Sequence, residues 1–227
     1  MAIDVKANLD VVNRRVAVAC QRVGRNPAEI RLIAVTKAFG PEAVEAAIAA
    51  GIGDIGENKV QEAREKKASV RSVAQWHFIG HLQSNKVKDA VKLFDTIQTL
   101  DSIPLATRVA KAAANEGVRL QVLIQVNLGK EAQKSGVPVA EVQPLVKAIA
   151  ADMPELKISG LMTLPPHLPP EELRPYFKRL RELRDELRVG VESCHELSMG
   201  MSEDFEVAIE EGATMIRLGR ALFGARK

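Results

Sequence analysis

The residue of this sequence best placed for chemistry is Lys37, which follows a short apolar run. Residues 31–36 are Arg-Leu-Ile-Ala-Val-Thr, and Phe-Gly-Pro follows at 39–41. An apolar run ended by glycine and proline is typical of a strand buried on both faces. Burial would lower the pKa of Lys37, and a neutral lysine amine attacks aldehydes. Lys37 is therefore a candidate Schiff-base residue for a carbonyl cofactor, and an ordinary exposed lysine is the alternative.

Two glycine-containing turns near the end of the sequence form a candidate phosphate site. Gly200 and Ser202 stand where a strand is predicted to pass into a helix, and Gly219 follows the last predicted strand. In barrels of parallel strands, the loops after the seventh and eighth strands often bind phosphate through backbone N–H groups. Glu203 and Asp204 would repel a phosphate unless their side chains point outward. A lysine that faces a phosphate site is a stronger signal than either part alone.

The elements that must position these groups alternate between strands and helices. Strands are predicted at 31–36, 53–56, 76–79, 94–98, 120–126, 157–162, 197–199 and 214–218. Helices are predicted at 41–50, 58–70, 84–92, 102–116, 139–151, 171–188 and 202–211. Apolar residues between Val5 and Val23 recur at steps of three and four, which predicts a further amphipathic helix that covers one end of the fold.

Eight short buried strands, most of them followed by a helix, predict a fold of the α/β class. We expect a (β/α)8 TIM barrel with an additional N-terminal helix, because barrels of this type occupy about 200 to 250 residues as one domain. The single domain would span residues 1–227. An open doubly wound sheet is the alternative, but the sequence has no Gly-x-Gly-x-x-Gly fingerprint for it.

Other polar residues at the predicted strand ends have local structural interpretations. Asn58 and Ser202 are typical helix N-caps, and Asn127 is a typical turn residue. His77 lies within a predicted strand, where packing or hydrogen bonding is expected more often than general base catalysis. Taken singly, these positions favour structural roles; only Lys37 together with the two late turns predicts a site.

Composition and charge exclude several classes of function. The chain has 32 basic and 29 acidic residues, a net charge of +3, and the two signs are interspersed, so no nucleic-acid partner is expected. Cys20 and Cys194 lack metal-type spacing, which predicts buried free thiols in a reducing compartment and no metal site. Charged residues near the N-terminus and the absence of a long apolar run predict a cytoplasmic protein with no membrane partner.

Six motifs are spread along the sequence: 34–37 (Ala-Val-Thr-Lys), 56–62 (Gly-Glu-Asn-Lys-Val-Gln-Glu), 76–80 (Trp-His-Phe-Ile-Gly), 159–162 (Ser-Gly-Leu-Met), 197–202 (Leu-Ser-Met-Gly-Met-Ser) and 216–224 (Ile-Arg-Leu-Gly-Arg-Ala-Leu-Phe-Gly). Together, and in this order, they resemble the pyridoxal-phosphate homeostasis proteins, and the resemblance runs from about residue 5 to residue 224. The resemblance implies a monomeric or weakly associating barrel like the N-terminal domain of alanine racemase. It also implies that pyridoxal 5′-phosphate is bound covalently without turnover.

The resemblance assigns roles to individual residues of this sequence. Lys37 would form the Schiff base, Ser202 and the backbone of Gly219 and Arg220 would hold the phosphate, and Arg217 would face the pyridine nitrogen. Asn58 and Met199 would line the cofactor more loosely. No residue is assigned a catalytic role.

The same residues favour a carrier over an enzyme. A guanidinium stays protonated, so Arg217 would face an unprotonated pyridine nitrogen, which makes the ring a weak electron sink and disfavours decarboxylation and transamination, although racemases of the same barrel type also use arginine. Alanine racemases also use a tyrosine from a C-terminal domain, whereas the only tyrosine here, Tyr176, lies in the amphipathic pattern of helix 171–188. We expect a carrier or buffer of pyridoxal 5′-phosphate that can pass it to apo-enzymes. The alternatives are a weak single-domain amino-acid racemase and an aldolase-like barrel that acts on a sugar phosphate.

Overall fold

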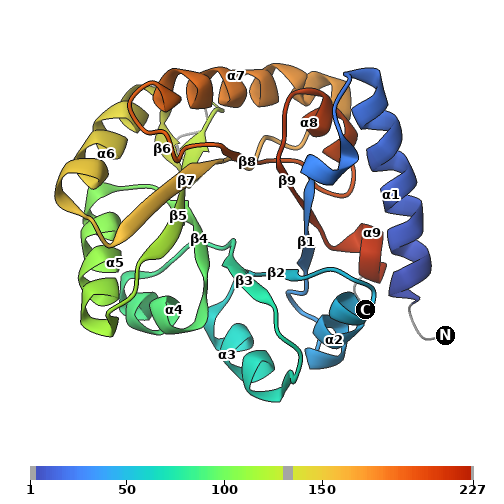
Figure 1. Cartoon of the computed structure of the whole chain (residues 1–227), viewed down its shortest axis with the longest axis horizontal. Helices are drawn as coiled ribbons and strands as arrows, with labels where there is room; N and C mark the ends of the chain where they lie inside the picture. The colour runs from blue at the N-terminus through green and yellow to red at the C-terminus, as the bar shows by residue number, and fades with distance from the viewer. Residues whose placement is uncertain (1–3, 130–134, 226–227) are drawn as a thin grey trace.

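The computed structural model describes residues 4–129 and 135–225. Eight parallel strands within this part of the chain close into a barrel, because β4 pairs with β5 and β1 pairs with β9 (Figure 1). The barrel strands are β1 (Arg31–Val35), β2 (Asp54–Glu57), β3 (Gln75–Phe78), β4 (Thr96–Leu100), β5 (Leu120–Asn127), β7 (Leu156–Met162), β8 (Glu196–Ser198) and β9 (Met215–Leu218). The short β6 (Val137–Pro138) pairs only with β5. The prediction of a (β/α)8 barrel is confirmed.

Helices surround the barrel on all sides (Figure 1). They are α1 (Val5–Arg22), α2 (Pro41–Ala49), α3 (Val60–Ser69), α4 (Val87–Leu93), α5 (Ile103–Glu116), α6 (Val139–Asp152), α7 (Pro170–Arg188), α8 (Phe205–Glu210) and α9 (Arg220–Phe223), with 3-10 turns at Pro27–Glu29 and Ser84–Lys86. The main hydrophobic core lies between this ring and the strands. A second, small cluster of Ile33, Leu123, Met162 and Met215 is separate from it.

The N-terminal helix α1 forms as predicted but does not cover an end of the barrel. Asp4 caps it by accepting a hydrogen bond from the Ala7 N–H at 2.9 Å. The helix then packs along the side of the barrel against α8 and α9 (Figure 1). These two helices are only six and four residues long, so α1 completes the ring where they leave it short.

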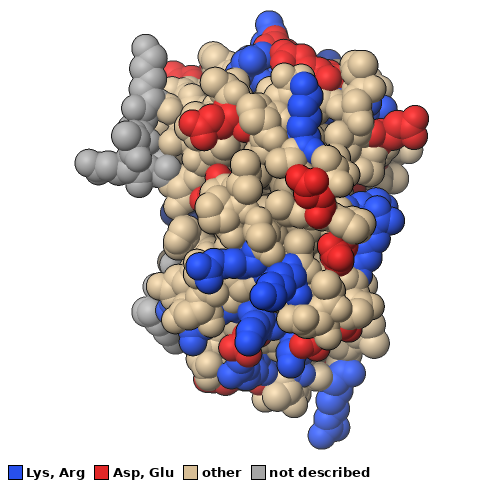
Figure 2. Space-filling view, turned by 90° about the vertical axis from the view of Figure 1, so that its left-hand side faces the viewer, with Lys and Arg blue, Asp and Glu red and all other residues tan. Residues whose placement is uncertain are grey.

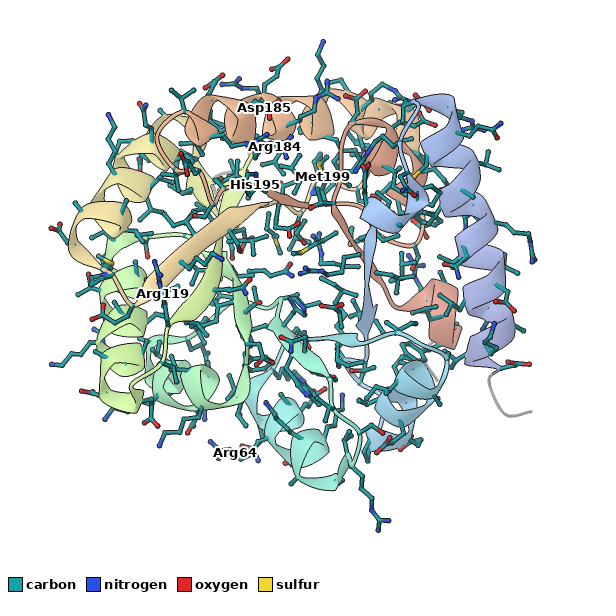
Figure 3. The ribbon with its side chains drawn as sticks, in the orientation of Figure 1. Arg64, Arg119, Arg184, Asp185, His195 and Met199 are labelled. Atoms are coloured by element: carbon teal, nitrogen blue, oxygen red, sulfur yellow. The ribbon has the colours of Figure 1, made fainter. Side chains whose placement is uncertain are left out.

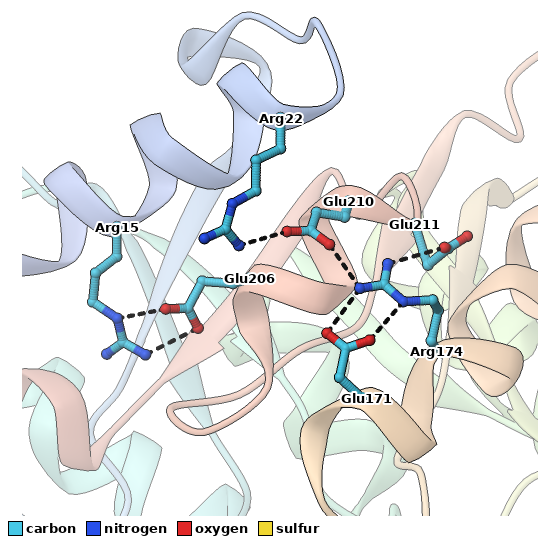
Figure 4. A network of polar contacts seen from close by, with 7 residues as sticks. All are labelled: Arg15, Arg22, Glu171, Arg174, Glu206, Glu210 and Glu211. Carbon is cyan, nitrogen blue, oxygen red and sulfur yellow. Dashed lines mark hydrogen bonds and ion pairs between the residues drawn. The ribbon is translucent and has the colours of Figure 1, made fainter.

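Ion pairs fasten α1 to α8 and α8 to α7 (Figure 4). Arg15 binds Glu206 through two hydrogen bonds of 2.6 and 2.9 Å. Glu210 accepts from Arg22 at 3.0 Å and from Arg174 at 2.8 Å. The carboxylates around Arg174 raise its pKa, mainly through the hydrogen bond to Glu171, so the guanidinium stays charged. The network fixes α8, the helix that follows the predicted phosphate turn.

Element boundaries differ from the predictions where local packing overrides the apolar pattern. The fourth strand is Thr96–Leu100 instead of 94–98. Phe94 ends α4 and packs against Phe78, with ring centroids 5.1 Å apart, while the Asp95 carboxylate accepts from the Trp76 N–H at 2.7 Å. These two residues therefore anchor the connection, and the strand begins after them.

Cysteine burial follows the sequence-based expectation, whereas surface charge is unevenly spread. On the face shown in Figure 2 several basic side chains adjoin in the lower half, with acidic side chains near them, and Lys92 pairs with Glu116 at 3.2 Å. Cys20 and Cys194 are buried free thiols, and burial raises the pKa of Cys194 to about 11. Of the helices in the described part of the chain, none is both long and apolar enough to span a bilayer.

Candidate functional site

Lys37 lies two residues after the end of β1, at the carboxyl end of the barrel where sites of this fold occur. The preceding residue, Thr36, is fully buried, whereas Lys37 is partly buried. The following residue, Ala38, has a φ of 65°. A left-handed conformation is uncommon for a residue with a Cβ, and it costs about 1 to 2 kcal/mol. The chain therefore makes a strained turn beside the predicted Schiff-base lysine.

Two side chains of α3 hold the peptide groups on either side of Lys37. Lys66 Nζ donates to the Thr36 carbonyl oxygen at 2.7 Å. Glu62 Oε2 accepts from the Ala38 N–H at 3.0 Å. Glu62 and Lys66 are four residues apart, so both project from the same face of the helix. This pair sets the backbone position from which Lys37 projects and stabilises the turn at Ala38.

The carboxylate of Glu57, the last residue of β2, completes this support. Glu57 Oε1 accepts from Thr36 Oγ1 at 2.5 Å and from Lys66 Nζ at 2.6 Å. Glu57 is fully buried, and its Oε2 atom has no hydrogen-bond partner among the described residues. Burial raises the pKa of Glu57, although the hydrogen bonds from Lys66 and Thr36 oppose the shift. The result is a buried, partly satisfied network directly behind the lysine.

The predicted phosphate turns join the same rim through β9, the neighbour of β1. Leu218 pairs with Ala34, and a Cβ placed on Gly219 would lie 3.4 Å from the Val35 carbonyl oxygen. Ser202 Oγ accepts from the Ala221 N–H in the first turn of α9 at 3.1 Å. Because the hydroxyl oxygen is the acceptor, its own hydrogen is available to an anion. The structure thus links both predicted turns and places them beside β1, the strand that leads to Lys37.

The two acidic residues after Ser202 do not oppose an anion in the way the sequence suggested. Glu203 is exposed and accepts from Arg220 at 2.7 Å. Asp204 turns inward and accepts from the Met201 N–H at 2.5 Å. Burial raises the pKa of Asp204, which favours its neutral form, while Arg217 acts in the opposite direction.

Arg217 projects into the barrel and is almost fully buried. It donates to Ser198 Oγ at 2.7 Å and to the Thr163 carbonyl oxygen at 2.8 Å. Burial lowers its pKa to about 10, and Asp204 acts against this shift. The guanidinium therefore remains charged at neutral pH, as expected for a fixed cationic donor.

Asn58 and Met199 take positions that the sequence did not specify. Asn58 Oδ1 is buried without a hydrogen-bond partner in the described structure. Met199 is fully buried in the main core, on the side of β8 that faces α7 and α8 (Figure 3). Met199 thus supports the strand end from behind. Contact of Asn58 or Met199 with a cofactor stays a prediction.

Both N-cap interpretations were wrong. The cap of α3 is Lys59, not Asn58, and α8 begins at Phe205 with Asp204 as its cap. Ser202 instead binds the first turn of α9, because the loop after β8 folds across the end of β9. The other structural interpretations are confirmed. His77 is buried and hydrogen-bonded at both ring nitrogens, and Asn127 Oδ1 accepts from the Gly129 N–H at 3.1 Å.

Sequence reasoning missed the roles of Glu62 and Lys66. The sequence analysis assigned neither residue a role, and Lys66 is only 4% exposed. A charged residue on the inner face of an amphipathic helix was the available signal, because a buried lysine needs a partner. Glu57, at the end of the preceding strand, is that partner.

Gly80 explains how the end of β3 packs beside Asn58. A Cβ on Gly80 would lie 2.2 Å from the Asn58 carbonyl oxygen. Gly80→Ala is therefore expected to destabilise the protein by about 3 kcal/mol and to weaken cofactor binding, since the backbone of Asn58 must move. Gly53→Ala is the matched control, because no atom lies within 4 Å of its Cβ position. Urea unfolding of both variants measures the difference, and equal midpoints would contradict this account.

The strand-end residues form a donor set that suits an aldehyde bearing a phosphate. Lys37 supplies an amine, Ser202 a hydroxyl hydrogen, and Arg217 a charged donor held in the barrel. Asn58 adds a buried side-chain oxygen that has no hydrogen-bond partner among the described residues. By contrast, a surface hollow of about 580 Å³ beside α7, which includes Asp185 and His195 (Figure 3), lies at the other end of the barrel. It contains none of the predicted site residues.

Comparisons with known proteins agree with this geometry. Residues 7–227 match the family model described as the alanine racemase N-terminal domain. The chain is 44% identical to a pyridoxal phosphate homeostasis protein of Aquifex aeolicus, covering 96% of this chain and 97% of the relative. It is 39% identical to a protein of the same name from Escherichia coli K12, covering 98% and 97%.

Two solved structures have a fold similar to that of this chain. The chain is similar to PipY of Synechococcus elongatus, solved with PLP bound, with a TM-score of 0.83 and 36% identity over 94% of this chain and 100% of that one. Alanine racemase from Corynebacterium glutamicum has a TM-score of 0.71 at 20% identity, covering 99% of this chain and 63% of that one, which shows a shared fold.

The fold and its strand-end residues define a barrel of the alanine racemase N-terminal class. The sequence relatives, matched over nearly their whole length, narrow this class further. The chain belongs to the pyridoxal phosphate homeostasis protein family.

Proposed function

We propose that this protein is a non-catalytic binder of pyridoxal 5′-phosphate that buffers or carries the cofactor in the cell. It would hold the reactive aldehyde as a Schiff base and release it to apo-enzymes. The names of the sequence relatives and the PLP-bound PipY structure support this proposal. A cytoplasmic location and a monomeric state are parts of the same proposal.

The observation that carries the proposal is the adjacency of Lys37 and the phosphate turns. Gly219 approaches the carbonyl of Val35, two residues before Lys37, and Ser202 binds the turn that follows Gly219. One rim therefore offers an amine for the aldehyde and donors for the phosphate. The bound group would supply an electrophilic carbonyl, and the protein residues would fix its two ends.

Each remaining residue would orient or hold the cofactor. The backbone of Gly219 and Arg220 and the Ser202 hydroxyl would bind the phosphate oxygens. Arg217, held by Ser198 and Thr163, would donate to the pyridine nitrogen and keep that atom unprotonated. Asn58 would offer its unpartnered oxygen to a donor of the ligand.

The same arrangement supports binding without catalysis. A pyridine nitrogen that accepts from Arg217 is a weak electron sink, which disfavours decarboxylation and transamination. Tyr176, the only tyrosine of the sequence, is partly buried in α7 and packs against the main core. It therefore does not stand over the rim as a second acid or base.

Exchange of the α-hydrogen of amino acids with solvent separates a carrier from a racemase. The loaded protein is incubated in D2O with a panel of L- and D-amino acids, and deuterium at the α-carbon is followed by proton NMR. The proposal predicts no exchange above that of free cofactor, with an alanine racemase as the positive control. Exchange at a catalytic rate that disappears in Lys37→Ala would instead establish the racemase.

Ser202→Ala is expected to weaken cofactor binding without removing the Schiff base. A hydrogen bond to a charged group contributes about 1.5 to 3 kcal/mol, which corresponds to about a 10- to 100-fold loss of affinity. Fluorescence or absorbance titration measures the affinity. Ser69→Ala is the control, because Ser69 is exposed at the end of α3. Unchanged affinity in Ser202→Ala would remove Ser202 from the phosphate site.

A further inference from the structure

A chain of hydrogen bonds crosses the inside of the barrel from Arg217 to its opposite end. Arg217 donates to Ser198 Oγ at 2.7 Å, and Ser198 Oγ lies 2.6 Å from Gln98 Oε1. Gln98 Nε2 lies 3.1 Å from His77 Nδ1, and His77 Nε2 lies 2.7 Å from Asp54 Oδ1. We call these five residues the interior chain. They come from β9, β8, β4, β3 and β2, so the chain spans the barrel.

The chemistry of its members gives the interior chain one direction. Arginine can only donate, so the Ser198 hydroxyl accepts from Arg217 and must donate to Gln98 Oε1. The Gln98 amide nitrogen then faces both His77 Nδ1 and Met215 Sδ, which are acceptors. His77 Nδ1 therefore carries no hydrogen, and His77 Nε2–H donates to the Asp54 carboxylate. Because Arg217 can only donate, the donor or acceptor role of each further member follows link by link.

Burial makes the chain sensitive to the loss of any link. Ser198 and Gln98 are fully buried, His77 is 1% exposed, and Arg217 is 3% exposed. Water cannot replace a lost partner in such a position, so each broken link leaves a donor or acceptor unpaired. Asp54 is the member nearest to solvent, with Arg31 Nε 4.0 Å from its carboxylate. The interior chain therefore ends in a charged group on both sides: the Asp54 carboxylate at one end and the Arg217 guanidinium at the other.

We propose that Ser198, Gln98 and His77 are positioning residues that hold Arg217 in the orientation in which it meets the pyridine nitrogen of bound pyridoxal 5′-phosphate. This inference rests on the proposed function, because that function places Arg217 at the ring. The hydrogen bond to Gln98 fixes the orientation of the Ser198 hydroxyl, and the Ser198 oxygen in turn fixes the Arg217 guanidinium. The electronic state of the bound ring is thus set by residues on the far side of the barrel.

The test uses the absorbance of the cofactor bound to the full-length protein, titrated with pH. Ser198→Ala, Gln98→Met and His77→Phe each break one link, and Arg217→Gln is the reference. The proposal predicts that each link variant shifts the midpoint of the Schiff-base titration in the same direction as Arg217→Gln, by about 0.5 to 1 pH unit. Met215→Leu is the matched control, since it touches the same Gln98 amide outside the chain, and its midpoint is expected to stay unchanged.

A merely structural role would lower the melting temperature of the link variants and leave the titration midpoint unmoved, which would overturn the inference. An unmoved midpoint in Arg217→Gln itself would instead contradict the proposed place of Arg217 at the ring. A second readout needs neither variant nor cofactor: the 15N shifts of the His77 ring in the wild-type protein. The chain requires the neutral tautomer with hydrogen on Nε2, and hydrogen on Nδ1 would refute it.

Discussion

Lys37→Ala is expected to abolish both the visible absorbance of the cofactor–protein Schiff base and the adduct trapped by borohydride. Only a primary amine in reach of the aldehyde can form this bond, and Lys37 is the lysine that follows β1 at the site rim. The phosphate donors remain in the variant, so weak non-covalent binding is expected to persist. Absorbance spectra distinguish the Schiff base from non-covalently bound cofactor, and mass spectrometry after reduction detects the covalent adduct.

Lys59→Ala is the matched control for this experiment. Lys59 is an exposed lysine near the end of β2, where it pairs with Glu62 at 2.9 Å. Its removal is expected to leave the spectrum and the trapped adduct unchanged. Retention of a stoichiometric adduct in Lys37→Ala would show that another lysine carries the cofactor.

The second large effect is expected from Lys66→Met, which removes the buried cation behind Lys37. Breaking a buried ion pair by deleting one partner destabilises a protein by about 3 to 5 kcal/mol. Here the loss leaves Glu57 without its charged partner and frees the Thr36 carbonyl. Because that carbonyl precedes Lys37, the yield of Schiff base is expected to fall as well. Denaturant unfolding and the visible absorbance measure these two consequences.

The destabilisation in Lys66→Met is expected to depend on pH, through Glu57. Burial already raises the pKa of Glu57, and the variant loses the hydrogen bond and charge of Lys66 that oppose this shift. A carboxyl whose pKa is higher in the folded state stabilises that state below its unfolded pKa, and this contribution is lost as pH rises through the folded pKa. The difference in unfolding free energy from wild type is therefore expected to grow between pH 5 and pH 8.

Two further variants separate the charge effect from a packing effect. Adding Glu57→Gln to Lys66→Met removes the uncompensated carboxylate, so the double variant is expected to recover stability at pH 8 relative to Lys66→Met. Lys88→Met, at an exposed position of α4, is expected to change stability by less than about 0.5 kcal/mol. A pH-independent loss in Lys66→Met, without recovery in the double variant, would contradict the role given to the Glu57–Lys66 pair.

The sequence indicates those site residues that lie at the ends of predicted strands. A buried apolar run that ends at Lys37, and glycine turns after the last two strands, are visible in the chain, and barrel geometry brings such ends to one rim. The structure shows this proximity in two contacts. Gly219 packs close to the Val35 carbonyl oxygen, and the Ala221 N–H donates a hydrogen bond to Ser202 Oγ.

The support behind Lys37 could not be predicted in the same way. Lys66 contacts Thr36 and Glu57 only when α3 packs on β1 and β2. The interior chain likewise joins residues from five strands, and its links appear only when the barrel closes. The start of β4 differs from the prediction because Phe94 packs on Phe78 at the end of the preceding strand, a contact that the apolar pattern does not show.

Peptide mapping of the reduced protein shows whether Lys37 holds pyridoxal 5′-phosphate on this rim. The wild-type protein, loaded with the cofactor, is reduced with borohydride, digested and mapped by mass spectrometry, with spectra recorded before and after reduction. The account predicts a visible Schiff-base absorbance that is lost on reduction and one stoichiometric modification, on Lys37. No visible absorbance, or a stoichiometric modification on any other lysine, would contradict it.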